Sequence, residues 1–106
     1  MTLLVRRARD EDLEMVAAWE ADNRSGATWT IKDLSEEFSH PKSCFWVATE
    51  GGEPCGYCVA RHLPDGFELL SILVPLAYRR RGVARQLMAA LHALSGTESV
   101  YLEVRA

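Results

Sequence analysis

Three short segments rich in aromatic and β-branched residues constrain this fold more than any other feature of the sequence. They read CFWVAT at 44–49, CGYCVARH at 55–62 and FELLSILV at 67–74. The connections between them, EGGEP and LPDG, contain the glycine, proline and aspartate that are typical of tight turns. We therefore expect three strands joined as an antiparallel meander.

A helix and another strand are expected to follow this meander. The helix is indicated by apolar residues at helical spacing, namely Val83, Leu87, Met88, Leu91 and Leu94. Gly96 stands where such a helix would end, and SVYLEV at 99–104 returns to a strand pattern. A strand, a helix and a strand in close succession predict a right-handed crossover between parallel strands. The sheet is then mixed.

The first forty residues predict one strand and two helices. TLLVRRA at 2–8 has a strand pattern, and Asp10 stands at the N-cap position of a helix over 11–22. Thr30 and Asp33 have the spacing of a capping box that opens a second helix. The expected order is β-α-α-β-β-β-α-β, an α/β chain (α+β mixed sheet) whose helices cover the sheet.

Composition narrows the classes of protein that fit. A chain of 106 residues with 48% apolar residues is expected to form one domain, spanning 1–106, with a single core. The net charge of −3 argues against a nucleic-acid binder, because such proteins carry excess positive charge. No apolar run is long enough to span a bilayer, and no export signal is recognised. We expect a soluble, cytoplasmic protein without membrane or nucleic-acid partners.

The cysteines predict buried thiols rather than a metal or redox site. Their number is odd, three, and only Cys55 and Cys58 are closely spaced. Because this pair lies in a strand pattern, we expect the two side chains to point to opposite faces of the sheet. A zinc site would also need a second pair of ligands, so no metal is expected.

The sequence YRRRGVARQ, between the third strand of the meander and the last helix, predicts an anion site. Amides at a helix start lack partners within the helix, and the helix dipole is positive there. Gly82 lets the backbone approach a phosphate without a Cβ in the way, and Ala84 is small. The added charge comes from Arg79, Arg80, Arg81 and Arg85.

The alternative is that these arginines form an ordinary solvated helix start. Cations at a helix N-terminus are unfavourable by a few tenths to about 1 kcal/mol. Four of them need compensation, which a bound polyphosphate would supply. The chain lacks the glycine patterns of a P-loop or a dinucleotide-binding turn.

These residues carry a family resemblance. ILVPLAYRRRGVARQLM resembles the acetyl-coenzyme A signature of the GNAT N-acetyltransferases, Q/R-x-x-G-x-G/A, through Arg79, Gly82 and Ala84. YLEVRA then follows with the spacing and wording of one branch, the ribosomal-protein alanine N-acetyltransferases. Together with the element order, the resemblance covers the whole chain.

The resemblance implies that acetyl-coenzyme A is bound along the strand that ends at Val74. The pantetheine arm would pair with backbone groups of Ile72, Leu73 and Val74. The phosphates would be held by the turn and helix start, at Arg79, Arg80, Arg81, Gly82, Val83, Ala84 and Arg85.

The resemblance also implies how the acetyl group reaches an amine. An α-amino group is mostly protonated at neutral pH, so a base is useful, and Glu103 matches the family's glutamate that accepts the amine proton. Without the family match, Glu103 is a surface carboxylate paired across the strand. Trp29 lies where the family places part of its acceptor-binding loop, which makes it a candidate substrate contact.

The family pattern continues beyond Ala106 through an asparagine, a helix with a tyrosine acid and two strands, so the match is to a C-terminally truncated fold. An open sheet edge would favour a homodimer. We expect an acetyl-coenzyme A-dependent N-acetyltransferase acting by direct transfer on an amine, such as a protein N-terminus. The alternative is a catalytically incomplete acetyl-coenzyme A-binding or assembly module.

Overall fold

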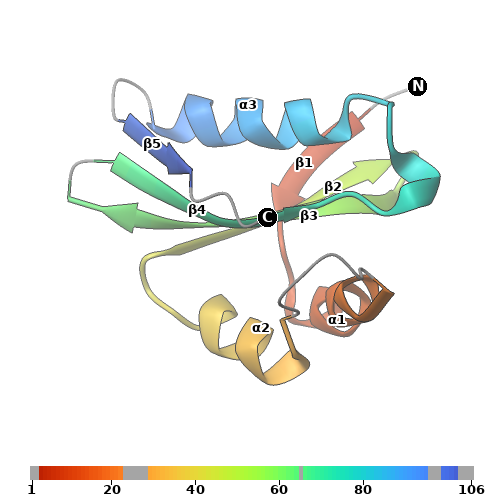
Figure 1. The fold of residues 1–106 in the computed structure, drawn as a ribbon, viewed down its shortest axis with the longest axis horizontal. Coiled ribbons are helices and arrows are strands. Elements are labelled where there is room, and N and C mark those ends of the chain that lie inside the picture. Colours follow the sequence, from red (N-terminus) through yellow and green to blue (C-terminus); the bar gives the residue numbers. More distant parts are fainter. Residues whose placement is uncertain (1–2, 23–28, 65, 96–98, 103–106) are drawn as a thin grey trace.

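The computed structural model of the chain describes residues 3–22, 29–64, 66–95 and 99–102 (Figure 1). The strands are β1 (Leu3–Arg7), β2 (Ser43–Glu50), β3 (Glu53–Leu63), β4 (Gly66–Leu73) and β5 (Ser99–Leu102). The helices are α1 (Leu13–Asp22), α2 (Ile31–Phe38) and α3 (Val83–Ser95), with short 3-10 turns at Asp10–Asp12 and Leu76–Tyr78. This is the predicted element order.

The strands form one sheet in the order β1-β2-β3-β4-β5. The first four are antiparallel neighbours, and β5 pairs with β4 in parallel through α3. Helix α3 covers one face of the sheet, and α1 and α2 cover the other (Figure 1). The mixed sheet and the parallel crossover predicted from the sequence are confirmed.

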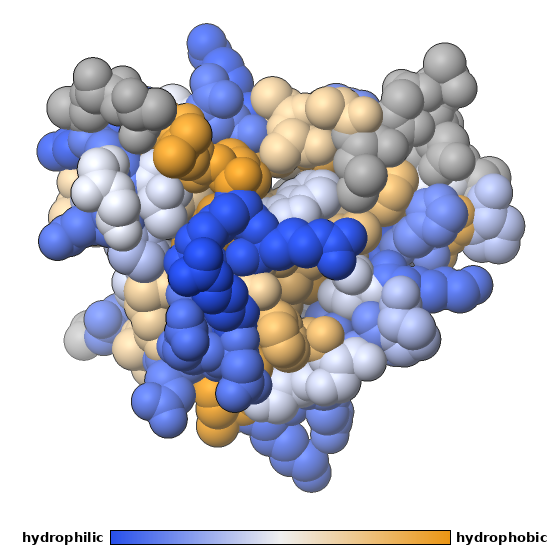
Figure 2. All heavy atoms as spheres, turned by 180° about the vertical axis from the view of Figure 1, so that it is seen from behind, coloured by the Kyte–Doolittle hydropathy of each residue, from blue (hydrophilic) through white to orange (hydrophobic). Residues whose placement is uncertain are grey.

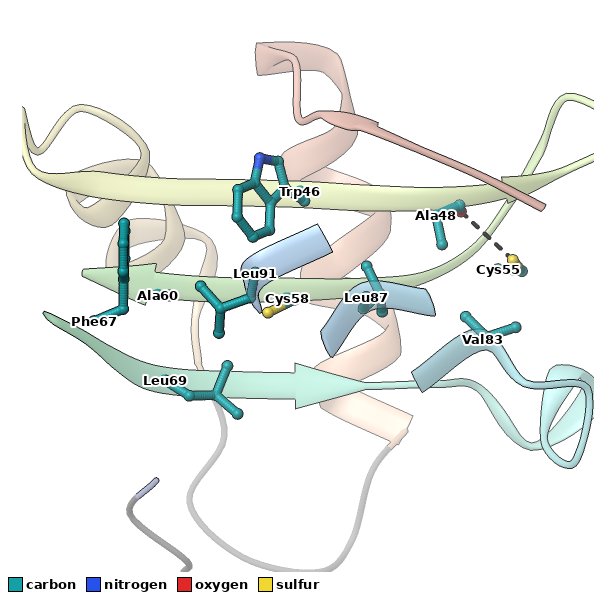
Figure 3. Packing of buried hydrophobic residues seen from close by; sticks show 10 residues of the cluster. All are labelled: Trp46, Ala48, Cys55, Cys58, Ala60, Phe67, Leu69, Val83, Leu87 and Leu91. Atoms are coloured by element: carbon teal, nitrogen blue, oxygen red, sulfur yellow. Dashed lines mark hydrogen bonds between the residues drawn. The ribbon is translucent and has the colours of Figure 1, made fainter. Parts of the chain in front are cut away.

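Each face of the sheet has its own apolar core. The α3 core lies between the sheet and α3 (Figure 3) and consists of Trp46, Ala48, Cys55, Cys58, Ala60, Phe67, Leu69, Val83, Leu87 and Leu91. The α1–α2 core consists of Leu13, Val16, Leu34, Phe45, Val47, Tyr57, Val59 and Leu73. The predicted helical stripe of α3 is confirmed at Val83, Leu87 and Leu91, which are buried, whereas the side chain of Leu94 and Gly96 lie outside the described residues.

The prediction that Cys55 and Cys58 point to opposite faces is wrong. Both side chains lie in the α3 core (Figure 3). The reason is a bulge in β3: Ala48 pairs with Gly56 and Thr49 pairs with Pro54, so Cys55 is an extra residue that interrupts the alternation.

The side chains of Cys55 and Cys58 are buried thiols, and that of Cys44 is half-buried. Cys55 donates a hydrogen bond from its Sγ to the carbonyl of Ala48, at 3.5 Å. Burial raises the pKa of the Cys58 thiol to about 12, and burial also raises the pKa of Cys55 and Cys44. These groups stay protonated at neutral pH, and an unionised thiol is a poor nucleophile and metal ligand.

The first helical turn begins one residue earlier than predicted, so Asp10 is not the N-cap. The Asp12 carboxylate accepts a hydrogen bond from the Arg9 N–H, at 2.7 Å, and two more from the Arg6 guanidinium. Burial opposes ionisation of Asp12, but these bonds and the arginine charges outweigh it and lower its pKa. The capping box of α2 is confirmed, since the Asp33 N–H donates to Thr30 Oγ1 and the Thr30 N–H donates to the Asp33 carboxylate.

The outer surface of the fold is mixed in hydropathy. On the face shown in Figure 2, strongly hydrophilic side chains gather at the centre, with apolar atoms exposed beside them. Leu4, Ile31 and Leu76 are the large apolar side chains that the described residues expose. None of the helices in the described ranges has the length and apolar content needed to cross a bilayer.

Gly56 allows the first turn of α3 to lie directly on the sheet. A Cβ at this position would be 2.9 Å from Val83 Cγ1 and 3.2 Å from the carbonyl oxygen of Leu73. Both distances are too short for an unstrained carbon contact. The glycine therefore fixes how close the start of α3 comes to β3 and to the end of β4.

Gly56→Ala is expected to lower the free energy of unfolding by about 1–3 kcal/mol, because the added methyl group forces Val83 out of its position. Urea unfolding measures this change. Val83→Ala removes the clashing atom, so the double variant should lose less stability than the sum of the two single variants. Strict additivity would show that Gly56 and Val83 do not determine each other's position.

Candidate functional site

Strand β4 contains a bulge halfway along. Ala60 pairs with Leu69 and Val59 pairs with Ser71, which leaves Leu70 as the extra residue. Pairing between β4 and β5 runs from Gly66–Ser99 to Leu69–Leu102, and Leu102 is the last described residue of β5. On its other edge, β4 continues to pair with β3 beyond the bulge, as far as Leu73.

The turn after β4 is held by its own hydrogen bonds. The Tyr78 N–H donates to the carbonyl of Pro75, at 2.9 Å, and Arg79 Nε donates to the carbonyl of Val74, also at 2.9 Å. The Arg79 side chain therefore closes the turn back onto the end of β4. Its guanidinium is partly occupied by this structural contact.

The start of α3 has the geometry that anion binding requires. Gly82 adopts a left-handed conformation with φ of 80°, and its carbonyl accepts the first helical hydrogen bond from the Gln86 N–H, at 3.0 Å. The amides of Val83, Ala84 and Arg85 precede that bond. A Cβ built on Gly82 would meet no atom within 4 Å, so a side chain at this position would point into open space.

The other arginines of the turn divide into two kinds. Arg81 donates to the Glu50 carboxylate, at 3.1 Å, and lies over the ring of Tyr78. Arg80 and Arg85 are exposed, and no ion pair joins either to another residue of the described ranges. Arg80 also adopts a left-handed conformation, with φ of 67°, which is unusual for a residue with a Cβ. All four arginines of the turn are exposed, but Arg79 and Arg81 already bind Val74 and Glu50, so Arg80 and Arg85 are the ones without a competing ion pair or carbonyl contact in the described ranges.

Glu50, at the end of β2, was not found by sequence reasoning. One carboxylate oxygen binds Arg81, and the other is buried without a hydrogen-bond partner among the described residues. No motif or spacing connects position 50 to position 81, so only the folded sheet brings them together.

A cluster of polar side chains lies on the α1–α2 face of the sheet, the face opposite to α3. The side chain of Glu20 is buried, and it accepts hydrogen bonds from the Tyr57 hydroxyl and from the backbone N–H of Trp29. The Tyr57 hydroxyl, in turn, is 2.7 Å from Ser71 Oγ. Burial raises the pKa of Glu20 against the effect of these bonds, and burial raises the pKa of Tyr57 strongly, so the phenol stays protonated. The cluster of Glu20, Tyr57 and Ser71 is called the polar relay below.

The polar relay was also missed by sequence reasoning, although one signal was present. Leu13, Val16 and Glu20 follow the spacing of one helical stripe, and the first two are buried. A carboxylate on an apolar stripe indicates a buried polar contact.

Most of the predicted site residues lie in one segment of the structure, and one of them, Glu103, is not among the described residues. Residues 72–74 and 79–85 form one continuous segment from the end of β4 to the start of α3. The Trp29 side chain packs partly against the α1–α2 core, and the backbone N–H of Trp29 donates to Glu20. Within the described ranges, no group of three or more histidine, cysteine or acidic side chains is arranged to hold a metal ion.

Comparison with known proteins identifies the family. Residues 10–106 match the sequence profile of the Acetyltransferase (GNAT) family. The chain belongs to the GNAT acetyltransferase family. The resemblance seen at residues 72–88 is confirmed at this level, and acetyl-coenzyme A is the acetyl donor that this family uses.

Solved structures share the fold of this GNAT chain. The ribosomal-protein-S18-alanine N-acetyltransferase of Escherichia coli has 21% identity and a TM-score of 0.87, over 99% of this chain and 68% of that one. Ard1 from Thermoplasma volcanium has 25% identity and a TM-score of 0.85, over 100% and 74%. AAC(6')-Iy, in complex with a bisubstrate analog of coenzyme A and acetylneamine, has 19% identity and a TM-score of 0.77, over 99% and 81%.

A sequence relative is longer than this GNAT chain. An uncharacterized protein of Mycobacterium leprae (strain TN) is 32% identical over 81 residues, which are 73% of this chain. The chain spans about a quarter of that relative's length, 23%.

Proposed function

We propose that the chain is an acetyl-coenzyme A-dependent N-acetyltransferase that moves an acetyl group directly to an amine. The observation that carries this proposal is the continuous segment from β4 to α3, where the strand end leads through a short turn to left-handed Gly82 and to a helix start whose first amides have no helical partner. A strand edge can bind the amide groups of a pantetheine arm, and a helix start can bind phosphates. The strand edge and the helix start follow one another along the chain in the same way as the pantetheine arm and the phosphates follow one another along coenzyme A.

In this proposal the residues of the turn have different tasks. Backbone groups of Ile72, Leu73 and Val74 bind the arm, and the amides at Gly82, Val83, Ala84 and Arg85 bind the pyrophosphate. Arg80 and Arg85 attract the phosphates, since neither has an ion pair to another residue of the described ranges. Arg79 and Arg81 hold the turn in shape, because their guanidinium groups already bind Val74 and Glu50.

Acetyl-coenzyme A supplies an acetyl group activated as a thioester. The neutral amine nitrogen attacks the thioester carbonyl, the carbon–sulfur bond breaks, and coenzyme A leaves as the thiol. The proton lost by the amine passes to Glu103, which acts as general base in this proposal. Trp29 contributes to the acceptor side, next to α1 and α2.

We propose a protein N-terminal α-amine as the acceptor, on the wording of YLEVRA at residues 101–106. Among the structural neighbours, one acts on a ribosomal-protein alanine and others bind the aminoglycosides neamine, as an acetylated analog, and sisomicin. Thiol release should therefore be measured with an alanine-initiated hexapeptide and with neamine. Donor binding without thiol release for either amine would select the catalytically incomplete binding module.

Cytoplasmic location and homodimer formation through a sheet edge stay predictions from the sequence. Light scattering of the purified chain measures the second, and a mass of one chain at high concentration would contradict it.

Gly82→Asp is expected to abolish donor binding, since it puts a carboxylate against the pyrophosphate. Isothermal titration calorimetry with coenzyme A measures the loss. Gly52→Asp is a matched control, because Gly52 is also left-handed and open but lies in the turn between β2 and β3. Equal affinity in both variants would show that the phosphates bind elsewhere.

Glu103→Gln is expected to leave donor affinity unchanged and to slow transfer by about 10²- to 10⁴-fold, the usual contribution of a general base. The loss should be greatest at low pH, where the amine is mostly protonated and depends most on the base. The pH–rate profile of thiol release checks this, with Glu53→Gln, at the exposed start of β3, as the control. An unaltered profile would remove Glu103 from this role.

A further inference from the structure

The polar relay gives the Ser71 hydroxyl a defined direction. When the Glu20 carboxyl is ionised it can only accept hydrogen bonds, and in that state it accepts one from the Tyr57 hydroxyl. The phenol has a single proton, which is used in that bond. The 2.7 Å contact between Tyr57 and Ser71 is then made by the serine proton. The Ser71 oxygen is left with lone pairs only, so it acts as an acceptor toward any further partner.

The bulge at Leu70 determines where that oxygen lies. It puts both Leu70 and Ser71 on the α1–α2 face of the sheet, Leu70 against the α1–α2 core and Ser71 against Tyr57. Ser71 is only partly buried, unlike the fully buried Tyr57. Its oxygen is therefore the accessible end of the relay.

Ser71 is also adjacent to the proposed donor site. The phosphates of the donor are assigned to residues 79–85 and its arm to residues 72–74. The arm then runs back along β4 from the turn, and its thioester end comes closest to residues 71 and 72. The α1–α2 side of that point is the side of Trp29, whose backbone N–H binds the same Glu20 carboxylate.

We propose that Ser71 accepts a hydrogen bond from an N–H of the amine acceptor, and that Tyr57 and Glu20 are positioning residues that hold its hydroxyl in the accepting direction. This inference rests on the proposed function. It adds a residue that orients the nitrogen lone pair toward the thioester carbonyl.

The proposal defines a class of acceptor. A neutral primary amine has two N–H groups, so it can give one to Ser71 and one to the base while its lone pair attacks. An N-methylated amine has a single N–H and cannot satisfy both. The enzyme should therefore prefer primary amines, and part of this preference should depend on Ser71.

The test compares two hexapeptides that differ only in an N-terminal alanine or N-methylalanine. Ser71→Ala should raise the KM for the alanine peptide roughly five- to tenfold, the size expected for one hydrogen bond. The KM for the N-methylalanine peptide should change less, so the discrimination between the peptides should fall by a similar factor. Ser71→Thr keeps the hydroxyl and should retain the discrimination, whereas Ser35→Ala, on the exposed face of α2, should change nothing.

Tyr57→Phe tests the relay without altering Ser71 itself. It should raise the KM for the alanine peptide in the same direction as Ser71→Ala, and the double variant should be no worse than Ser71→Ala alone, because Tyr57 acts through Ser71. Additive effects on KM would overturn the positioning role. Coenzyme A affinity, measured by calorimetry, should stay unchanged in every variant.

The outcomes separate this inference from the proposed function. Failure of the wild-type chain to bind coenzyme A removes the proposed function and this inference with it. Thiol release by the wild type with an unchanged KM in Ser71→Ala overturns only the inference. Where the donor binds without turnover, the affinity of the alanine peptide for the coenzyme A complex is the readout, and equal affinities of wild type and Ser71→Ala overturn the role of Ser71.

Discussion

The bulge at Leu70 is the constraint on which the candidate site depends. A regular β4 would alternate its side chains to the end, and Ser71 would then face α3 instead of Tyr57. The extra residue turns Ser71 to the α1–α2 side. One inserted residue thus decides which face Ser71 takes in the half of β4 assigned to the donor.

The two cores fix this half of β4 from both sides. On one side, α3 lies close enough to β3 that only a glycine fits at position 56, and this sets the height of the helix start above the sheet. On the other side, Glu20 and Tyr57 connect α1 and β3 to Ser71. The strand end and the turn are therefore held by packing and by buried hydrogen bonds rather than by exposed charge.

Features that depend on residues three or four apart could be predicted from the sequence. The Thr30–Asp33 capping box and the apolar stripe of α3 are of this kind, and so is the meander, whose turns carry their own glycines. The faces of Cys55 and Ser71 could not be predicted, because a bulge results from how a helix fits on distant strands. The charge on the turn was predicted, but which arginines bind other residues of the protein and which do not depends on partners such as Glu50, 31 positions away.

The ion pair between Glu50 and Arg81 has a consequence for how such chains can diverge. One carboxylate oxygen of Glu50 binds Arg81, and the other is buried without a hydrogen-bond partner in the described ranges. Loss of Arg81 would therefore leave the whole carboxylate without a partner at the edge of the α3 core. Loss of the glutamate would release a third guanidinium toward the donor phosphates. Substitution of either Glu50 or Arg81 alone would change the site. Relatives that have lost one of the two residues are therefore expected to have lost the other. A strand end in the first half of the chain is in this way inherited together with the arginine-rich turn in the second.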